Sequence, residues 1–427
     1  MTVTDARTAA PWESLRSAPH NGISAKIAAR LFRSAVARLH VSVRLDHPDG
    51  TSEQLGLGGP AIVVHRPAEF FARIGRDKLI GFGESYMTGA WSEDGEPADG
   101  VLGEFLTVMA SDIAQLVPPS LQKLRALVVP RLPRSHRGTT ENTQANVAHH
   151  YDLSNDLFTA FLDPTLSYSA ALFEDLETAL TEDFAAAQHR KIDRLLDQAG
   201  VGEGTRLLEI GTGWGELAIR AAERGAVVRS ITLSVEQQQL ARDRIAAAGH
   251  AEQVQVDLCD YRALLEEPAG QYDAVVSVEM IEAVGWEFWP TYFQTLDHVL
   301  APGGIVAIQA ITMPHDRMLA TRSTHTFITK YIFPGGALPS VEAIHEVVDT
   351  HTSLRVSDEF GFGAHYAPTL QRWDRAFLES VAQVNGLGFD ETFVRMWHFY
   401  LEYCRGGFAA GYIDDHQLTF TRPGEES

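Results

Sequence analysis

The feature of this sequence that most constrains its fold is an alternation of short apolar runs with helix-like stretches between residues 206 and 311. Strands are enriched in Val and Ile, whereas an amphipathic helix repeats its apolar residues every three or four positions. The expected strands are 206–211, 226–233, 254–258, 272–278 and 304–311, and the clearest expected helices are 235–249 and 290–301. This alternation predicts an α/β fold with a doubly wound, mainly parallel sheet. Ligands of such sheets bind beyond the carboxyl ends of the strands.

One predicted turn at a strand end carries spaced glycines. The strand containing Glu209 runs into Gly211, Gly213 and Gly215, where the backbone can turn sharply and approach a ligand without a Cβ. The spacing is E-x-G-x-G-x-G rather than the G-x-G-x-x-G that opens a pyrophosphate-binding helix. The next strand ends in ITLSVEQQQ, without the ribose-binding acid of a dinucleotide enzyme. Both details favour S-adenosylmethionine, with Glu209 placed to anchor its ammonium group. A turn kept for packing alone is the alternative.

The charge balance restricts the partners of the chain. Its 427 residues include 35 basic and 56 acidic side chains, for a net charge of −21, which disfavours nucleic acid because phosphates would be repelled. No run of 18 apolar residues predicts a membrane span, and the N-terminus does not have the pattern of an export signal. The two cysteines fit no metal or redox spacing. We therefore expect a cytoplasmic protein without a bound metal.

A linker is predicted around Pro130 and Pro133, which separates a smaller N-terminal α+β domain (1–135) from the α/β domain (136–427). Two basic segments, 24–44 and 122–137, interrupt the acidic composition. In the first, apolar residues recur every fourth position, as one stripe of an amphipathic helix does: Ile23, Ile27, Leu31, Ala35 and Leu39. The two segments are interpreted either as a core-packed helix and a solvated linker, or as surfaces that dock on lipid head groups.

Several segments together resemble the cyclopropane-fatty-acyl-phospholipid synthases and mycolic acid methyltransferases. They are, in order, HHYDLSNDLFTAFLDPTLSYSAALFED, LLEIGTGWGELAI, ITLSVEQQ, CDYRAL, SVEMIEAVG, TKYIFPGGALPS and FYLEYCRGGFAAGYI. The N-terminal domain also matches, through LIGFGESYMTGAWSEDG. That domain is typical of family members that act on intact phospholipids. The resemblance therefore implies a class I methyltransferase fold, S-adenosylmethionine as cofactor and a phospholipid acyl chain as substrate.

The resemblance also implies roles for individual residues in cofactor binding. Tyr168 and Ser169 would hold the methionine carboxylate, and Gly211 and Gly213 would line the cofactor. The ribose would contact a threonine and a glutamine, and the adenine would lie near an aspartate; these residues are Thr232, Gln237 and Asp260.

The catalytic positions depart from the family pattern. In the cyclopropane synthases a bicarbonate is thought to act as the base, held by a cysteine, a glutamate, a histidine, a backbone group and a tyrosine. Here the glutamate is kept as Glu282 and the tyrosine as Tyr331, with Ile311 at the backbone position. Ala170 replaces the cysteine and Gln309 the histidine. Two side chains that would hold bicarbonate are therefore missing, which calls that site into question.

A gained carboxylate offers a replacement for the bicarbonate. Glu279 stands where the family usually has glycine, three residues before Glu282. A helical turn would point both side chains the same way, so that Glu279 fills the bicarbonate volume and acts as base, with Glu282 as its hydrogen-bonded partner. Two neighbouring carboxyls in an apolar pocket do not ionise together easily. The candidate catalytic residues are Glu279, Glu282, Gln309 and Tyr331; Glu279 as a plain surface acid is the alternative.

The altered base favours one product. A hydride shift after methyl transfer, followed by proton loss from the new methyl group, gives an exocyclic methylene. The chain would then be similar to the actinobacterial enzymes that begin the synthesis of 10-methyl (tuberculostearic-type) fatty acids, with a separate reductase as partner. The rival interpretations are a cyclopropane synthase with a remodelled base, a methyltransferase of a small molecule or a carrier-bound acid, and an inactive lipid-binding relative. We also expect transient contact with the inner face of the membrane. A homodimer is compatible with the resemblance, although nothing in the residues requires it.

Overall fold

The computed structural model describes residue 12, residues 15–116 and residues 154–424. The chain divides into two compact units, which are Met1–Leu127 with Leu370–Ala410, and Val128–Thr369 with Gly411–Ser427. The first unit thus takes in residues 370–410, which the sequence-based boundary at 135/136 assigned to the second domain. The predicted linker around Pro130 and the second basic segment lie outside the described residues.

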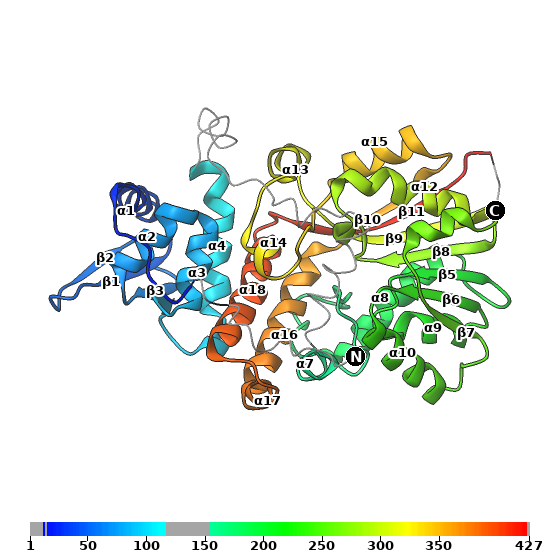
Figure 1. Cartoon of the computed structure of the whole chain (residues 1–427), viewed down its shortest axis with the longest axis horizontal. Helices are drawn as coiled ribbons and strands as arrows, with labels where there is room; N and C mark the ends of the chain where they lie inside the picture. Colours follow the sequence, from blue (N-terminus) through cyan, green and yellow to red (C-terminus); the bar gives the residue numbers. More distant parts are fainter. Residues whose placement is uncertain (1–11, 13–14, 117–153, 425–427) are drawn as a thin grey trace, which may run out of the picture. The chain divides into compact units, whose positions relative to one another are not determined.

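The second unit is built on a seven-stranded sheet with the order β10-β11-β9-β8-β5-β6-β7 (Figure 1). Its strands are β5 (Arg206–Ile210), β6 (Val227–Thr232), β7 (Val254–Leu258), β8 (Tyr272–Val278), β9 (Leu300–Thr312), β10 (Arg355–Gly361) and β11 (Asp414–Thr421). The pairs among β5 to β9 are parallel, whereas β11 is antiparallel to both β9 and β10. The predicted α/β fold and mainly parallel sheet are confirmed, and β10 and β11, which add two antiparallel pairings at one end of the sheet, were not predicted.

Helices cover both faces of this sheet (Figure 1). The helices of the unit are α7 (Asn155–Thr159), α8 (Phe184–Gln198), α9 (Glu216–Glu223), α10 (Val235–Ala247), α11 (Ile281–Val284), α12 (Trp289–Val299), α13 (His315–Thr321), α14 (Phe327–Tyr331) and α15 (Val341–His351). Apolar side chains of α8, α9 and α10 form one core with the sheet, and those of α12 and α15 form the other. Because β5 and β8 are covered on both faces, they read as near-continuous apolar runs.

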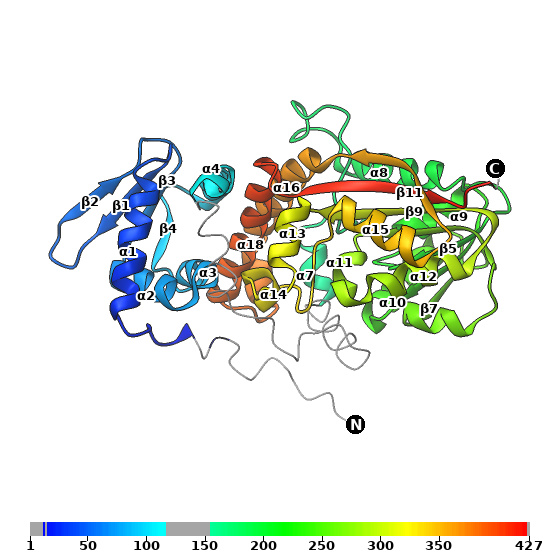
Figure 2. The ribbon, with the colours of Figure 1, turned by 90° about the horizontal axis from the view of Figure 1, so that it is seen from above.

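The first unit contains a four-stranded sheet with the order β2-β1-β3-β4 (Figure 2). Its strands are β1 (Ser42–Asp46), β2 (Ser52–Leu55), β3 (Ala61–Val64) and β4 (Trp91–Glu93). Its helices are α1 (Ile23–Val36), α2 (Pro67–Asp77), α3 (Leu79–Met87), α4 (Val101–Leu116), α17 (Val381–Gly386) and α18 (Glu391–Ala409), and α16 (Tyr366–Glu379) enters it from the second unit. The helix α18 packs against α3 and α4, which explains why residues 370–410 group with the N-terminal segment.

Candidate active site

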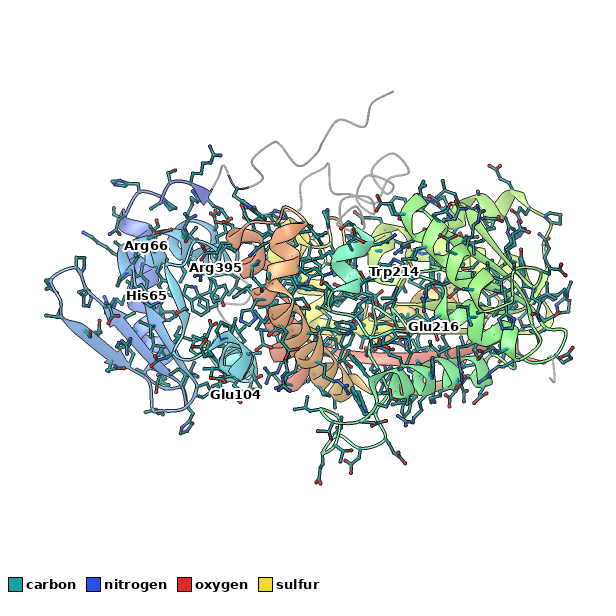
Figure 3. The ribbon with its side chains drawn as sticks, turned by 90° about the horizontal axis from the view of Figure 1, so that it is seen from below. His65, Arg66, Glu104, Trp214, Glu216 and Arg395 are labelled. Atoms are coloured by element: carbon teal, nitrogen blue, oxygen red, sulfur yellow. The ribbon has the colours of Figure 1, made fainter. Side chains whose placement is uncertain are left out.

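The glycine-rich turn connects β5 to α9, and Figure 3 labels its Trp214. Gly211, Gly213 and Gly215 all have positive φ, at 99°, 53° and 90°. A Cβ at Gly211 would lie 2.6 Å from Cγ of Met280, whereas a Cβ at Gly213 would meet nothing within 4 Å. The first glycine is therefore required by close packing and conformation. The second leaves the backbone uncovered at the carboxyl end of the sheet, where a ligand can approach.

Tyr168 is connected to this turn through one intervening aromatic ring. The ring of Tyr168 meets Phe158 edge-on with centroids 5.1 Å apart, and Phe158 in turn lies 4.9 Å from the ring of Trp214. Ser169 is buried, and its Oγ accepts a 2.5 Å hydrogen bond from Nζ of Lys191. The segment that precedes α8 is thus joined to the glycine-rich turn through aromatic packing.

Glu209 lies inside the protein at the end of β5. It is 3% exposed, and its Oε2 accepts a 2.5 Å hydrogen bond from Oγ of Ser230, which also bonds Oγ1 of Thr212 at 2.6 Å. Burial raises the pKa of Glu209 to about 8. This chain of hydrogen bonds ties the glycine-rich turn to the neighbouring strand.

The residues predicted to contact ribose and adenine follow the next two strands. Thr232 ends β6, and its hydroxyl donates a 2.9 Å hydrogen bond to Oε1 of Gln237 in the first turn of α10. Asp260 follows β7 and accepts hydrogen bonds from the backbone and guanidinium of Arg262. The cofactor candidates therefore gather at the carboxyl ends of β5, β6 and β7, as ligand-binding groups of such sheets do.

These groups fit S-adenosylmethionine. The uncovered backbone at Gly213 leaves room for a ligand, and the polar side chains at the adjacent strand ends would supply hydrogen-bonding groups to its amino acid and ribose. When bound, the cofactor supplies an electrophilic methyl group on a sulfonium.

Glu279 follows β8 in the left-handed region, with φ 49°, a conformation that favours glycine. Its Oε1 accepts hydrogen bonds from the backbone N–H of Ala170 at 3.0 Å and from Nε2 of Gln309 at 2.8 Å. Its Oε2 accepts a 2.7 Å hydrogen bond from the hydroxyl of Tyr366. Both residues that replace the cysteine and the histidine thus donate to this gained carboxylate.

Glu282 accepts a hydrogen bond from the backbone group that the resemblance assigned to bicarbonate binding. Its Oε1 accepts a 2.5 Å hydrogen bond from the N–H of Ile311, and its buried Oε2 has no hydrogen-bond partner among the described residues. Burial, and next the charge of Glu279, raise the pKa of Glu282 to about 8, so that it is mostly protonated at neutral pH. Tyr331 ends α14 and packs against Phe327, with ring centroids 5.1 Å apart.

Behind Glu279 lies a buried polar layer. Nε2 of Gln309 also donates to Oδ2 of Asp415 at 2.8 Å, while Oε1 of Gln309 accepts from Nε2 of Gln417 at 3.4 Å. Nη1 of Arg194 donates to Oε1 of Gln417 at 2.8 Å. This order fixes the orientation of both amides, because Arg194 can only donate. The amide of Gln309 is thereby turned so that its NH₂ group faces the two carboxyls.

The hydrogen bonds favour one carboxyl of this cluster as the charged one. The carboxyl of Glu279 accepts three hydrogen bonds, and the buried Lys191 attracts its negative charge. Burial, and next the charges of Glu279 and Glu282, raise the pKa of Asp415 well above its ordinary value. Burial also raises the pKa of Glu279, but the donors around its carboxylate oppose that rise. Glu279 is therefore the member of the cluster best placed to be ionised.

One detail of the sequence-based hypothesis is wrong. The two carboxyls were expected to hydrogen-bond each other, but Glu279 bonds Ala170, Gln309 and Tyr366, whereas Glu282 bonds Ile311. The cause is the backbone, since the left-handed conformation of Glu279 precedes the short helix α11 instead of belonging to it.

Sequence reasoning missed four residues in and around the layer behind Glu279, namely Lys191, Arg194, Asp415 and Gln417. They come from α8 and β11, far from Glu279 in sequence, and no local motif marks them. Tyr366, the third donor to Glu279, was not among the candidate catalytic residues.

Two absences hold for the described parts of the chain. In residues 15–116 and 154–424, no group of three or more His, Cys, Asp or Glu side chains could hold a metal ion. None of the helices in these ranges combines the length and the hydropathy that a membrane span requires.

The sheet order, the glycine-rich turn and the polar strand ends define a class I S-adenosylmethionine-dependent methyltransferase. Residues 138–418 match the family model described as mycolic acid cyclopropane synthetase, and the chain belongs to that family. It is 51% identical over 420 residues to tuberculostearic acid methyltransferase UfaA1 of Mycobacterium tuberculosis, covering 97% of this chain and 96% of that protein.

Two further comparisons agree with this assignment. Cyclopropane-fatty-acyl-phospholipid synthase of Escherichia coli is 32% identical over 364 residues, covering 85% of this chain and 88% of that protein. The crystal structure of mycolic acid cyclopropane synthase CmaA1 complexed with SAH and CTAB superposes with a TM-score of 0.58 at 32% identity, covering 65% of this chain and 97% of that chain. The chain is an S-adenosylmethionine-dependent fatty acyl methyltransferase.

Proposed function

We propose that this enzyme methylates the double bond of an unsaturated, oleoyl-like acyl chain in phospholipid and converts it, still esterified, to a methylene-branched acyl chain, the precursor of a 10-methyl fatty acid. The observation that carries the proposal is the position of Glu279, whose carboxylate accepts hydrogen bonds from both residues that replace the bicarbonate-holding side chains. The 51% identity to a tuberculostearic acid methyltransferase supports the same product class.

The proposed reaction assigns a definite task to Glu279. The π electrons of the alkene form a bond to the transferred methyl carbon as the bond from that carbon to sulfur breaks and its electron pair stays on sulfur, which leaves a carbocation on the neighbouring alkene carbon. A hydride shifts from the methylated carbon to that neighbour, and the cation moves to the methylated carbon. Glu279 then takes a proton from the new methyl group, and the C–H electron pair becomes the exocyclic double bond. A fixed carboxylate in a dry site also stabilises the cation before the proton leaves.

Bicarbonate does not fit this site. The N–H of Ile311 donates to Glu282, and the N–H of Ala170 and the amide of Gln309 donate to Glu279. The donors that would hold the anion are therefore already used, and a further negative charge beside Glu279 would be repelled. No step of the proposed reaction requires it.

The test of this role is turnover with and without bicarbonate. Purified enzyme is assayed on dioleoyl phospholipid with S-adenosylmethionine in carbon-dioxide-depleted buffer, and the rate is compared after bicarbonate is added. We expect the same rate in both conditions. A rate that depends on bicarbonate would remove Glu279 from the role of base.

The methylene product requires a second enzyme. Saturating it to a 10-methyl chain needs a hydride donor, and the glycine-rich turn of this chain is already assigned to S-adenosylmethionine. We propose a separate reductase for that step. The homodimer, the cytoplasmic location and the lack of nucleic acid binding stay predictions.

A further inference from the structure

The first helix of the N-terminal unit presents an aliphatic stripe to solvent. Ile23, Ile27 and Leu31 are 79%, 55% and 65% exposed, and their spacing of four residues places them along one side of α1. The opposite side of the helix packs inward through Ala28 and Val36. Seen from above in Figure 2, α1 has no other element of its unit over it. The predicted helix is confirmed, but these three residues of its stripe face away from the core.

Basic side chains border this stripe. Lys26 and Arg30 are exposed, and each precedes an exposed aliphatic residue by one position, which places both along one edge of the stripe. Arg38, just beyond the helix, is exposed as well. Arg33 differs, because it forms a 2.8 Å ion pair with Glu53.

The charge of this region is opposite to that of the whole chain. Residues 22–45 contain no Asp or Glu, although the net charge of the protein is −21. An exposed aliphatic stripe with a basic edge is the pattern of a helix that lies in the interface of an anionic bilayer. In a protein that anionic surfaces otherwise repel, such a local patch also determines which side approaches the membrane.

A second copy of the chain suits this surface less well. Two-fold pairing of α1 with its symmetry mate would place the same patch on both partners, and Lys26 and Arg30 would face like charges. An anionic lipid surface instead satisfies the aliphatic and the basic side chains together.

We propose that α1 docks the enzyme on anionic phospholipid bilayers. Ile23, Ile27 and Leu31 insert among the acyl chains near the surface, while Lys26, Arg30 and Arg38 bind the head-group phosphates. This inference deepens the proposed function by naming the surface from which the substrate is taken, and it rests on that function for the identity of the lipid.

The test is co-sedimentation with vesicles of dioleoylphosphatidylglycerol or dioleoylphosphatidylcholine. The stripe variant carries Ile23→Ser, Ile27→Ser and Leu31→Ser, and the matched control replaces three exposed aliphatic residues of the second unit, namely Leu176→Ser, Leu180→Ser and Val227→Ser. We expect the stripe variant to bind phosphatidylglycerol vesicles about 100-fold more weakly than the native enzyme, at about fivefold per side chain, and the control to bind like it.

A charge variant tests the second element of the surface. Replacing Lys26, Arg30 and Arg38 by Gln should weaken binding by about fivefold per charge at low salt and flatten its salt dependence. Thermal melts of every variant should match the native protein, because all substituted side chains are exposed.

Activity separates this proposal from the proposed function. The stripe variant should keep the native rate on dioleoyl phospholipid in detergent micelles and lose rate on vesicles. Native-like vesicle binding by the stripe variant would overturn the docking role. The docking role would also be overturned if the native enzyme dimerised with rising concentration without binding vesicles and the stripe variant lost that dimerisation. Native turnover in micelles without vesicle binding would overturn docking and leave the proposed function standing.

Discussion

Replacing Glu279 by glutamine tests the proposed base while keeping its shape. The glutamine oxygen can still accept from the N–H of Ala170 and from Gln309, and its new NH₂ group would face the hydroxyl of Tyr366, which can accept as well as donate. The variant also removes a buried carboxylate whose pKa is raised by burial. We therefore expect the free energy of unfolding to change by less than about 1 kcal/mol.

The effect on catalysis should be much larger than the effect on stability. A positioned general base contributes about 10²–10⁴-fold to a rate, so Glu279→Gln should lower kcat by that factor, equivalent to about 3–5 kcal/mol in the barrier. The assay is transfer of a labelled methyl group to dioleoyl phospholipid, with S-adenosylmethionine affinity measured by calorimetry. Affinity should stay within about twofold, because none of the predicted cofactor residues bonds this carboxylate. A variant that retains most of its activity would refute Glu279 as the base.

Three further predictions follow from the same site. Glu279→Gly should lose activity and regain part of it with added bicarbonate, because glycine suits the φ of 49° and leaves the volume of the carboxylate empty. A variant whose activity does not respond to bicarbonate would contradict the idea that Glu279 occupies the bicarbonate position. Burial raises the pKa of Glu282 from 4.5 to about 8, so its contribution to stability is lost as pH rises from about 5 to 8. Glu282→Gln should therefore flatten the decline in Tm over that range. An unchanged slope of Tm against pH would contradict the raised pKa of Glu282. Arg194→Leu should free the amide of Gln417 to flip, which should lower kcat and shift the acid limb of its pH profile without changing the KM for S-adenosylmethionine. Arg194→Lys should restore the native kcat and the native pH profile. An unmoved pH profile in Arg194→Leu would reduce Arg194 to a structural role.

Local sequence was sufficient to predict the parallel half of the sheet and the glycine-rich turn. Strands β5 and β8 are buried on both faces, so their apolar runs are visible without any tertiary information. Strand β10 has mostly exposed or half-buried residues with no clear alternation, and β11 begins with the acids Asp414 and Asp415. Strand β10 lies at the edge of the sheet, and β11, between β10 and β9, is composed mainly of polar residues, so neither carries a clear hydrophobic signal and both were missed.

The site was only partly predictable for a related reason. Glu279 stood out because it occupies a position where the family usually has glycine, and Ala170 and Gln309 stood out as replacements. The contact between them depends on the left-handed backbone at Glu279, which the sequence does not encode in a recognisable pattern. The role of Asp415 depends on the pairing of β11 with β9, which places it opposite Ile311.

The α1 stripe shows a limit of periodicity. A spacing of four residues predicts that Ile23, Ile27 and Leu31 share one side of a helix, but it does not tell which side meets the core. In the structure the small residues Ala25 and Ala28 face inward, since they allow α1 to approach α2 closely; a Cβ on Gly75 of α2 would lie only 2.7 Å from the backbone of Ala25.

The most direct test of the central claim is the structure of the product. The methylene-branched and cyclopropane acids have the same mass, so the phospholipid fatty acids of a host that expresses this enzyme and is supplied with oleate must be analysed by proton NMR. We predict the two vinylidene protons of an exocyclic methylene in an acid one carbon longer than oleate. The strongly shielded ring protons of a cyclopropane would instead contradict the assignment of Glu279 as a base that acts after the hydride shift.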